Sequence, residues 1–377
     1  MRFSDFVTLQ RGFDLTKTAM QEGPYPVIGS TSIIGHHHEF KVEPPGVVTG
    51  RSGSLGVVQY VAEKYWPHNT SLWVKDFKGN DPKFVYYCMQ AMDFARFNAG
   101  AGVPTLNRNH LDSLEVEVPP LPVQQRIAAI LSAYDELIEN SQRRIKILES
   151  MARALYREWF VHFRFPGHED HPCVASPLGE TPQGWEVRCV TDAVHVNPRV
   201  IVPREGEKPF VPMGCLSNDS MLISEIESRT GNSGAKFQNG DTLFARITPC
   251  LENGKTGYVQ FLPDANAVAF GSTEFIVLRS ASLTPEFVYC LARSDEFRGV
   301  AIKSMSGASG RQRVQEKCFD DFQIAQPPLA LLEKFSAIVA PSFRLIYRLH
   351  LQIQNLRRTR DLLLPRLLSG QIDLEAC

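Results

Sequence analysis

The sequence predicts an α+β fold in which two sheet-rich regions are each followed by a long helix. Two observations predict this class: the chain contains an internal repeat, and within each copy a strand-like alternation gives way to helical periodicity. Short alternating apolar runs bounded by turn residues, such as residues 56–61 and 273–278, are typical of strands. The sheet and helix signals lie in separate segments, which favours α+β.

The repeat is clearest where the strand pattern ends. Residues 111–121 (LDSLEVEVPPL) align with residues 319–329 (FDDFQIAQPPL) at an offset of 208, and this offset continues into the helical segments. Further upstream the offset becomes 203, where residues 82–86 (PKFVY) match residues 285–289 (PEFVY). Weaker echoes pair residues 26–29 with 211–214, and residues 48–51 with 243–246. The chain is therefore a duplication.

Each copy ends in a long amphipathic segment that begins after a Pro-Pro pair. Apolar or small residues at spacings of three and four predict a helical stripe in the first copy at Ile127, Ile130, Tyr134, Leu137, Ser141, Ile145, Leu148, Ala152, Leu155 and Trp159. The second copy has a comparable stripe at Phe335, Ile338, Ser342, Leu345, Leu349, Ile353 and Leu356. A helix of this length, roughly 60 Å, exceeds what one small domain covers, so mutual pairing is favoured over packing on its own region.

The second helical segment departs from the first at two places. Pro341 removes a backbone donor and is expected to kink or interrupt the helix. Residues 331–334 read LLEK where the first copy has VQQR at 123–126. We therefore expect the two helices to differ in the surfaces they present.

Length and composition bound the class of protein. At roughly 150 residues per domain, 377 residues indicate two or three compact units, and 43% hydrophobic content is ordinary for a globular protein. There is no apolar run of the length that a membrane span needs and no signal-peptide pattern at the start, so we expect a cytoplasmic protein that does not contact a membrane. A net charge of -1 gives no overall indication of nucleic-acid binding.

No set of residues with the spacing of a catalytic, cofactor or metal site stands out. The eight cysteines form no CxxC pair, which argues against a zinc site or a disulfide framework. Residues 253–256 (NGKT) lack the first glycine of a phosphate-binding loop and are interpreted as a turn, and residues 50–56 as a hairpin loop. Residues 36–38 (HHH) have no second cluster to complete a metal site. We expect a chain with no cofactor, no metal and no catalytic residues.

Four phrases carry a resemblance to a known family. They are residues 119–127 (PPLPVQQRI), 159–167 (WFVHFRFPG), 177–187 (PLGETPQGWEV) and 359–370 (TRDLLLPRLLSG). Together with the duplicated architecture, they closely resemble the DNA-specificity (S) subunit of type I restriction-modification systems. The resemblance extends over essentially the whole chain.

The resemblance implies two target recognition domains in a pseudo-two-fold arrangement, separated by two long antiparallel coiled-coil helices. The implied segments are recognition domain 1 at residues 1–117, spacer helix 1 at 118–165, recognition domain 2 at 166–325 and spacer helix 2 at 326–377. Such a subunit recognises a bipartite, asymmetric target in double-stranded DNA. Its implied partners are two adenine methyltransferase (M) subunits and restriction/translocase (R) subunits, which carry out the methyl transfer and cleavage.

Candidate DNA contacts are polar or basic residues on loops, since arginine reads guanine and amides read adenine. They are Arg51, Ser52, Ser54, Asn69, Thr70, Asn107 and Arg108 in the first copy, and Arg246, Thr248, Asn253, Lys255, Arg311, Gln312 and Arg313 in the second. Arg51 and Arg246 occupy matched positions, where a shared structural salt bridge is the alternative. Asn69 and Thr70 have the alternative of forming a turn. The glycine-rich loops around Gly102 and Gly310 are candidates for phosphate approach.

The helical stripes supply the candidate residues for partner docking. These are Ile127, Tyr134, Leu137, Ile145, Leu148, Leu345, Ile353 and Leu356. The stripes are expected to bind each other and the methyltransferase subunits, with Leu137 inside the seam. The alternative function is a coiled-coil scaffold that joins proteins without binding DNA, and an enzyme of another class has little support in the sequence.

Overall fold

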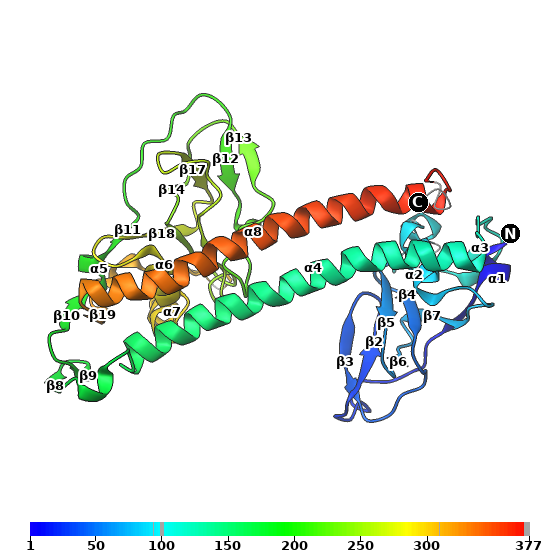
Figure 1. Cartoon of the computed structure of the whole chain (residues 1–377), viewed down its shortest axis with the longest axis horizontal. Coiled ribbons are helices and arrows are strands. Elements are labelled where there is room, and N and C mark those ends of the chain that lie inside the picture. Colours follow the sequence, from blue (N-terminus) through cyan, green and yellow to red (C-terminus); the bar gives the residue numbers. More distant parts are fainter. Residues whose placement is uncertain (93, 99–101, 309, 373–377) are drawn as a thin grey trace. The chain divides into compact units, whose positions relative to one another are not determined.

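The computed structural model describes residues 1–92, 94–98, 102–308 and 310–372 and divides into two compact units (Figure 1). Unit 1 comprises residues 1–139 and 354–377, and unit 2 comprises residues 140–353. Each unit contains one sheet-rich region, here called the first region (residues 1–117) and the second region (residues 166–325). Within the described residues, no helix has both the length and the apolar character needed to span a bilayer.

The first region contains two small sheets and three short α-helices. Its strands are β1 (Thr8–Arg11), β2 (Tyr25–Ile28), β3 (Ile33–His37), β4 (Gly46–Gly50), β5 (Val58–Val61), β6 (Trp66–Pro67) and β7 (Ser71–Asp76). Its helices are α1 (Phe3–Phe6), α2 (Pro82–Ala91), the 3-10 turn η1 (Phe94–Phe97) and α3 (Arg108–Asp112). Helix α2 begins at Asp81, whose side chain accepts from the N–H of Phe84, with Pro82 at the first helical position.

The second region is longer and has more strands. They are β8 (Cys173–Ser176), β9 (Gly179–Pro182), β10 (Glu186–Cys189), β11 (Val194–Val196), β12 (Lys208–Val211), β13 (Glu227–Arg229), β14 (Ala235–Gln238), β15 (Thr242–Ala245), β16 (Thr256–Tyr258), β17 (Val268–Gly271), β18 (Phe275–Ser280) and β19 (Gln323–Gln326). Its helices are η3 (His168–Asp170), α5 (Val190–Ala193), η4 (Met213–Cys215), α6 (Pro285–Ala292), α7 (Asp295–Lys303) and η5 (Glu316–Phe319).

The two regions repeat one sheet topology. The antiparallel sheet β1-β7-β4-β5 of the first region corresponds to β11-β18-β15-β16 of the second. In the other sheet, β2 pairs antiparallel with β3 and parallel with β6, and β12 pairs in the same senses with β13 and β17. Strand β14 extends this sheet and has no counterpart among the described strands of the first region. The duplication seen in the sequence is therefore a duplication of fold.

The strand pairing shifts the alignment of residues 26–29 with residues 211–214 by two residues. The N–H of His68 donates to the Ile28 carbonyl at 2.9 Å, and in the second region the N–H of Ser272 donates to the Val211 carbonyl at 3.0 Å. Ile28 therefore corresponds to Val211, whereas the echo aligned it with Met213. A sequence match of only four residues is too short to determine which residues of two strands are equivalent.

The long helices are α4 (Leu121–Tyr156), which continues into a π-helical turn η2 (Arg157–Val161), and α8 (Leu329–Leu368). In unit 1, Asp135 of α4 accepts a hydrogen bond from Arg360 of α8 at 2.5 Å. In unit 2, the rings of Trp159 and Phe335 lie 6.1 Å apart. From residue 135 to residue 159 of the first long helix, the partner on α8 changes from residue 360 to residue 335. The two helices therefore pack antiparallel. Two sheet-rich regions and two long helices packed together confirm the predicted α+β class.

Burial along the helices corrects the predicted stripe. Fully or almost fully buried positions recur every seven residues at Leu131, Ile138, Ile145, Ala152 and Trp159. The predicted stripe stepped from Ile130 to Leu137 and so drifted by one residue. Leu137 is 49% exposed, and the prediction that it lies inside the seam is wrong.

The second helix shows the same heptad spacing. Its buried positions include Leu332, Val339, Ile346 and Ile353, whereas Ile338, one residue off this series, is 53% exposed. Helix α8 is continuous through Pro341, so the expected interruption does not occur. Helix α8 tolerates the missing backbone donor because the proline lies on an exposed position.

In each unit, a tyrosine of the sheet-rich region donates a hydrogen bond to a carboxylate on α4. In unit 1 the Tyr87 hydroxyl donates to Asp135 at 2.5 Å, and burial together with this bond raises the pKa of Tyr87. In unit 2 the Tyr289 hydroxyl donates to Glu149 at 2.5 Å, and Glu149 also accepts from the N–H of Met221 at 2.9 Å. Figure 1 shows α2 between the strands of the first region and α4. These bonds join the sheet-rich region of each unit to α4.

Candidate nucleic-acid interface

In the first region the loop after β4 carries Arg51 and is held by backbone hydrogen bonds. The N–H of Arg51 donates to the Thr70 carbonyl at 2.8 Å, and its carbonyl accepts from the N–H of Leu106 at 2.8 Å. The N–H of Gly53 donates to the Pro104 carbonyl at 2.9 Å. The loop is therefore tied to two segments that are distant in the sequence.

The loop after β15 in the second region repeats these three bonds. The N–H of Arg246 donates to the Glu274 carbonyl at 3.0 Å, and its carbonyl accepts from the N–H of Val314 at 2.8 Å. The N–H of Thr248 donates to the Gln312 carbonyl at 3.0 Å. The two arginines that the repeat aligns therefore occupy equivalent positions on a shared backbone structure.

A groove of about 640 Å³ in the first region collects three of the predicted residues, Arg51, Asn107 and Arg108. Asn107 caps α3, because its side chain accepts from the N–H of Asn109 at 3.1 Å. Further polar side chains on the groove walls, which the sequence analysis did not single out, are Gln10, Arg11 and Asn109. Strand end, loop and short helix converge here, which no local sequence pattern reveals.

Of the three arginines that line this groove, Arg11 pairs with Asp14 at 2.8 Å, whereas Arg51 and Arg108 have no carboxylate partner among the described residues. The Arg51 guanidinium donates to the Asn69 carbonyl at 3.3 Å, and that of Arg108 to the Leu9 carbonyl at 3.5 Å. In the described part of the chain, neither arginine forms an ion pair, and none of the residues that line the groove is acidic. The groove is therefore suited to an anion.

Of the remaining predicted contacts of the first region, some hold the arginine loop in place and others are exposed on its surface. The Thr70 carbonyl accepts from the N–H of Ser52 at 3.1 Å, and the Asn69 side chain donates to the Asp14 carboxylate. Asn69 and Thr70 thus contribute to the turn that holds the arginine loop, as the turn alternative expected. Ser54 is exposed at the loop tip.

In the second region the matched arginine is in an ion pair. Arg246 lies 3.0 Å from the Glu316 carboxylate, so the salt-bridge alternative describes this residue. Arg313 binds Glu274 through two nitrogens on one edge of its guanidinium, at 2.6 Å from Nη2 and 2.9 Å from Nε. Hydrogen bonding from Arg313 lowers the pKa of Glu274, which keeps the carboxylate ionised.

Three of the other predicted contacts in the second region have structural partners. The N–H of Gln312 donates to Thr248 Oγ1 at 3.0 Å, and Lys255 Nζ donates to a carbonyl of η4 at 3.0 Å. Asn253 and Arg311 are exposed. The predicted residues of this region therefore do not gather in one groove.

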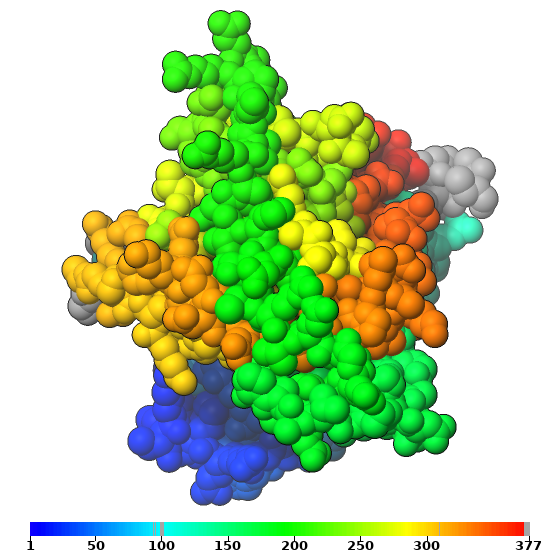
Figure 2. All heavy atoms as spheres, turned by 90° about the vertical axis from the view of Figure 1, so that its left-hand side faces the viewer, coloured from blue at the N-terminus to red at the C-terminus, as the bar shows by residue number. Residues whose placement is uncertain are grey.

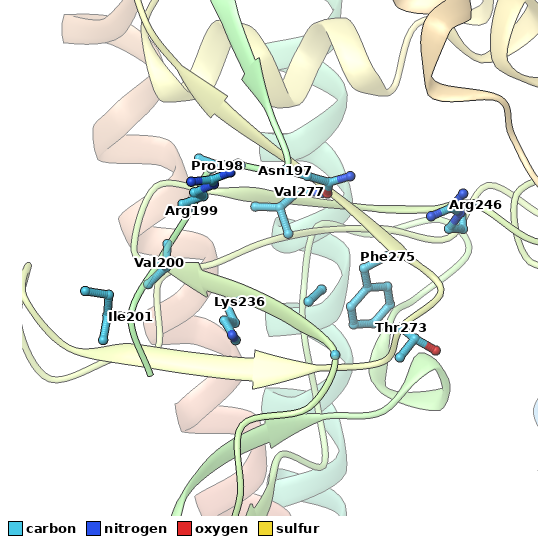
Figure 3. A pocket seen from close by; sticks show the side chains of 12 residues that line it. Asn197, Pro198, Arg199, Val200, Ile201, Lys236, Arg246, Thr273, Phe275 and Val277 are labelled. Carbon is cyan, nitrogen blue, oxygen red and sulfur yellow. The ribbon is translucent and has the colours of Figure 1, made fainter. Parts of the chain in front are cut away.

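A groove of about 590 Å³ in the second region contains cations that the sequence analysis missed (Figure 3). Arg199 and Lys236 line it, and Arg246 lies at its other end. Segment 197–201 forms one wall and carries Ile201, which is 92% exposed. Figure 2 shows that the green part of the chain, in the second region, lies at the surface. The one available signal was the arginine-containing and proline-containing composition of residues 198–204.

A family model for the type I restriction modification DNA specificity domain matches residues 1–150. The chain is 26% identical over 343 residues to the type I restriction enzyme MjaIX specificity subunit of Methanocaldococcus jannaschii, which covers 85% of this chain and 77% of the relative. The similarity to type I restriction-modification specificity subunits extends over most of the chain and agrees with the role expected from the sequence.

Other comparisons agree with this specificity-subunit assignment. The EcoEI specificity subunit of Escherichia coli is 31% identical over 156 residues, which are 40% of this chain and 26% of that relative. The crystal structure of a type I restriction-modification S subunit from M. genitalium has the same fold, with a TM-score of 0.63, 16% identity, and coverage of 97% of this chain and 95% of that chain.

The segments that could be mistaken for other sites have structural roles in this specificity subunit. Residues 253–256 cover the end of a turn, in which Gly254 has a φ of 84°, and the first residue of β16. Within the described residues no group of three or more histidine, cysteine or acidic side chains is placed to hold a metal ion. In the glycine-rich loops, Gly100, Ala101 and Ser309 lie outside the described residues, while Gly102 is exposed and Gly310 has a φ of 77°.

The predicted docking residues of the specificity subunit differ widely in exposure. Ile127, Ile145 and Ile353 are 1%, 5% and 5% exposed. Those that are half-buried are Tyr134, Leu148, Leu345 and Leu356. Leu137 is the exposed member of the set, at 49%. Buried side chains are used within the chain, which leaves the exposed helix positions for a partner.

Proposed function

We propose that this specificity subunit recognises a bipartite, asymmetric target in double-stranded DNA and directs methyltransferase and restriction subunits to it. Each region reads one half of the target, and the two helices hold the regions at a fixed separation. Recognition domains at residues 1–117 and 166–325, with spacer helices at 118–165 and 326–377, are the division we propose. A cytoplasmic location follows from a DNA substrate.

The observation that carries the proposal is one backbone frame with two different sets of side chains. The loops of Arg51 and Arg246 share three equivalent backbone hydrogen bonds, yet the surrounding residues differ in charge, size and partner. A conserved frame with divergent polar side chains is what reading two unlike half-sites requires, because base edges are distinguished by donor and acceptor patterns. A scaffold protein would have no need for two divergent cationic grooves.

The contacts we propose lie in the two grooves or on other loops of the same regions. In the first region they are Arg51, Ser52, Ser54, Asn107 and Arg108, with Asn69 and Thr70 shaping the loop. In the second region Arg199 and Lys236 join the exposed residues Asn253 and Arg311 as candidates. Arginine and lysine supply phosphate contacts, and the amide groups supply base contacts.

A domain exchange tests the function. Replacing residues 168–318 with the matching region of a relative should change one half-site and leave the other intact, because the first region is untouched. The matched control replaces residues 1–117 and should change the other half-site. Methylated adenines are mapped in DNA from cells that carry the complete system. Loss of both half-sites in a complex that still assembles would contradict separate reading.

The helices are proposed to dock the methyltransferase subunits through their exposed apolar positions. Leu137 and Ile138 are adjacent on α4 but differ in exposure, at 49% and 6%. Leu137→Asp is expected to leave the fold intact and weaken assembly with the methyltransferase. Ile138→Asp is expected to destabilise the chain by about 3 kcal/mol, because it buries a charge.

Co-purification with the methyltransferase and circular dichroism of the free chain check the two variants. Normal assembly of the Leu137→Asp variant would remove this position from the docking surface. The purified chain alone is expected to show neither methyl transfer nor cleavage, and reproducible turnover by a homogeneous preparation would contradict the non-catalytic role.

A further inference from the structure

The two matched loops differ in net charge at four equivalent positions. Their hydrogen bonds and bridges align Arg51 with Arg246, Thr70 with Glu274 and Thr105 with Arg313. The same offset aligns Arg108 with Glu316, each directly after the cap of its short helix. These positions therefore carry two cations and no anion in the first region, and two cations with two anions in the second.

The anions of the second region are bound to its cations. Glu316 lies 3.0 Å from Arg246, and Glu274 holds Arg313 through two of its nitrogens. A phosphate that approached either arginine would have to displace a carboxylate already in bidentate or close contact. In the first region, the guanidinium groups of Arg51 and Arg108 donate only to backbone carbonyls among the described residues, which leaves their charge uncompensated.

We propose that the specificity subunit contacts the DNA backbone asymmetrically at these matched loops. Arg51 and Arg108 bind phosphate in the first region, whereas Arg246 and Arg313 are structural and make no phosphate contact. The inference rests on the proposed DNA-binding function. Glu316 and Glu274 thus occupy the two arginines with ion pairs inside the protein. The second region therefore contacts DNA phosphates through other residues.

Salt dependence separates the two roles, because each phosphate contact contributes a slope of about 0.9 to the fall of log affinity with log salt. The experiment uses the assembled complex with the methyltransferase and a DNA duplex that contains its mapped target. The double variant Arg51→Gln with Arg108→Gln should lower the slope by about 2. The matched variant Arg246→Gln with Arg313→Gln should leave the slope unchanged.

Two further variants keep the test decisive if the glutamine substitutions disturb folding. Arg51→Lys with Arg108→Lys retains charge and should retain the slope. Arg108→Glu gives Arg51 the partner that Arg246 has, and should lower the slope as the glutamine pair does.

Equal losses of slope in the two regions, or no loss in the first, would overturn the asymmetry while leaving DNA recognition intact. Absence of target-selective binding by the unaltered complex would instead overturn the proposed function. The two failures are therefore distinguishable in one set of titrations.

Discussion

The first and second regions share one backbone arrangement but have different side chains at equivalent positions. The difference is clearest at the buried start of the equivalent strands β4 and β15. In the second region Asp241, 1% exposed, binds Arg279 with both carboxylate oxygens at 2.7 and 2.6 Å. The corresponding position in the first region is Gly46, over which the fully buried Tyr65 ring lies. A side-chain carbon at Gly46 would approach that ring to 2.4 Å, so no carboxylate fits there.

The comparison teaches which interactions define the frame. Backbone hydrogen bonds recur at equivalent positions in both regions, and they do not depend on side-chain type. At the positions compared, ion pairs occur in the second region alone. One is buried, at Asp241, and another is exposed, at Arg313. Side chains at these positions are therefore free to diverge without loss of fold, which suits a protein whose two halves face different sequences.

The largest expected effect comes from breaking the buried pair of the second region. Asp241→Ala should lower the free energy of unfolding by about 3 to 5 kcal/mol, because it leaves Arg279 without its carboxylate. Urea unfolding of the full chain measures the loss, and hydrogen exchange should localise it to β14, β15 and β18.

The matched control alters Lys75, which corresponds to Arg279 but is exposed in the first region. Lys75→Ala should change stability by less than about 0.5 kcal/mol. A loss below about 1 kcal/mol for Asp241→Ala would show that the buried pair does not distinguish the two regions energetically.

A smaller effect is expected where each region meets its following helix. Gln124 is buried and its side chain donates to Asn80 at 2.8 Å and to the Pro119 carbonyl at 2.9 Å, while accepting from the N–H of Asp81 at 3.0 Å. The second copy has Leu332, 1% exposed, at this position. Gln124→Leu should cost about 2 kcal/mol, since it orphans these groups.

Thermal unfolding followed by circular dichroism measures this change. The reciprocal variant Leu332→Gln should also destabilise the chain, because the apolar site offers no designed partners for an amide. If both variants were neutral, the polar and apolar junctions would be interchangeable, and the helix copies would differ less than their sequences indicate.

The sequence predicted the duplication, the fold class and the long helices, because a repeat of 208 residues and a helical period are properties of the chain alone. It predicted the helix face less well. Leu137 was expected in the seam because a three-four spacing admits two neighbouring series, and only packing selects the one through Ile138.

The candidate interface was predictable in part for a different reason. Arg51, Asn107 and Arg108 meet in one groove, and the alternative of a salt bridge at Arg246 was foreseen. Arg199 and Lys236 were missed, because their groove is assembled from β14, β15, β18 and the segment after β11, which are far apart in the sequence. Sequence spacing identifies a loop but not the segments that fold against it.

The smallest expected effect is a pH dependence confined to the second region. Hydrogen bonding from Arg313 lowers the pKa of Glu274, so the pair stabilises the fold above the ordinary glutamate pKa of about 4.3 and the stabilisation is lost as the pH falls through the lowered value. Because Arg313 is 47% exposed, the contribution should be below about 1 kcal/mol. Glu274→Gln should therefore flatten the acid limb of the unfolding free energy by this amount, whereas Thr70→Gln, at the matched position of the first region, should leave that limb unchanged. Equal acid limbs in the unaltered chain and in Glu274→Gln would show that the exposed pair stores no stability, and that the charge difference between the two loops acts on ligand binding alone.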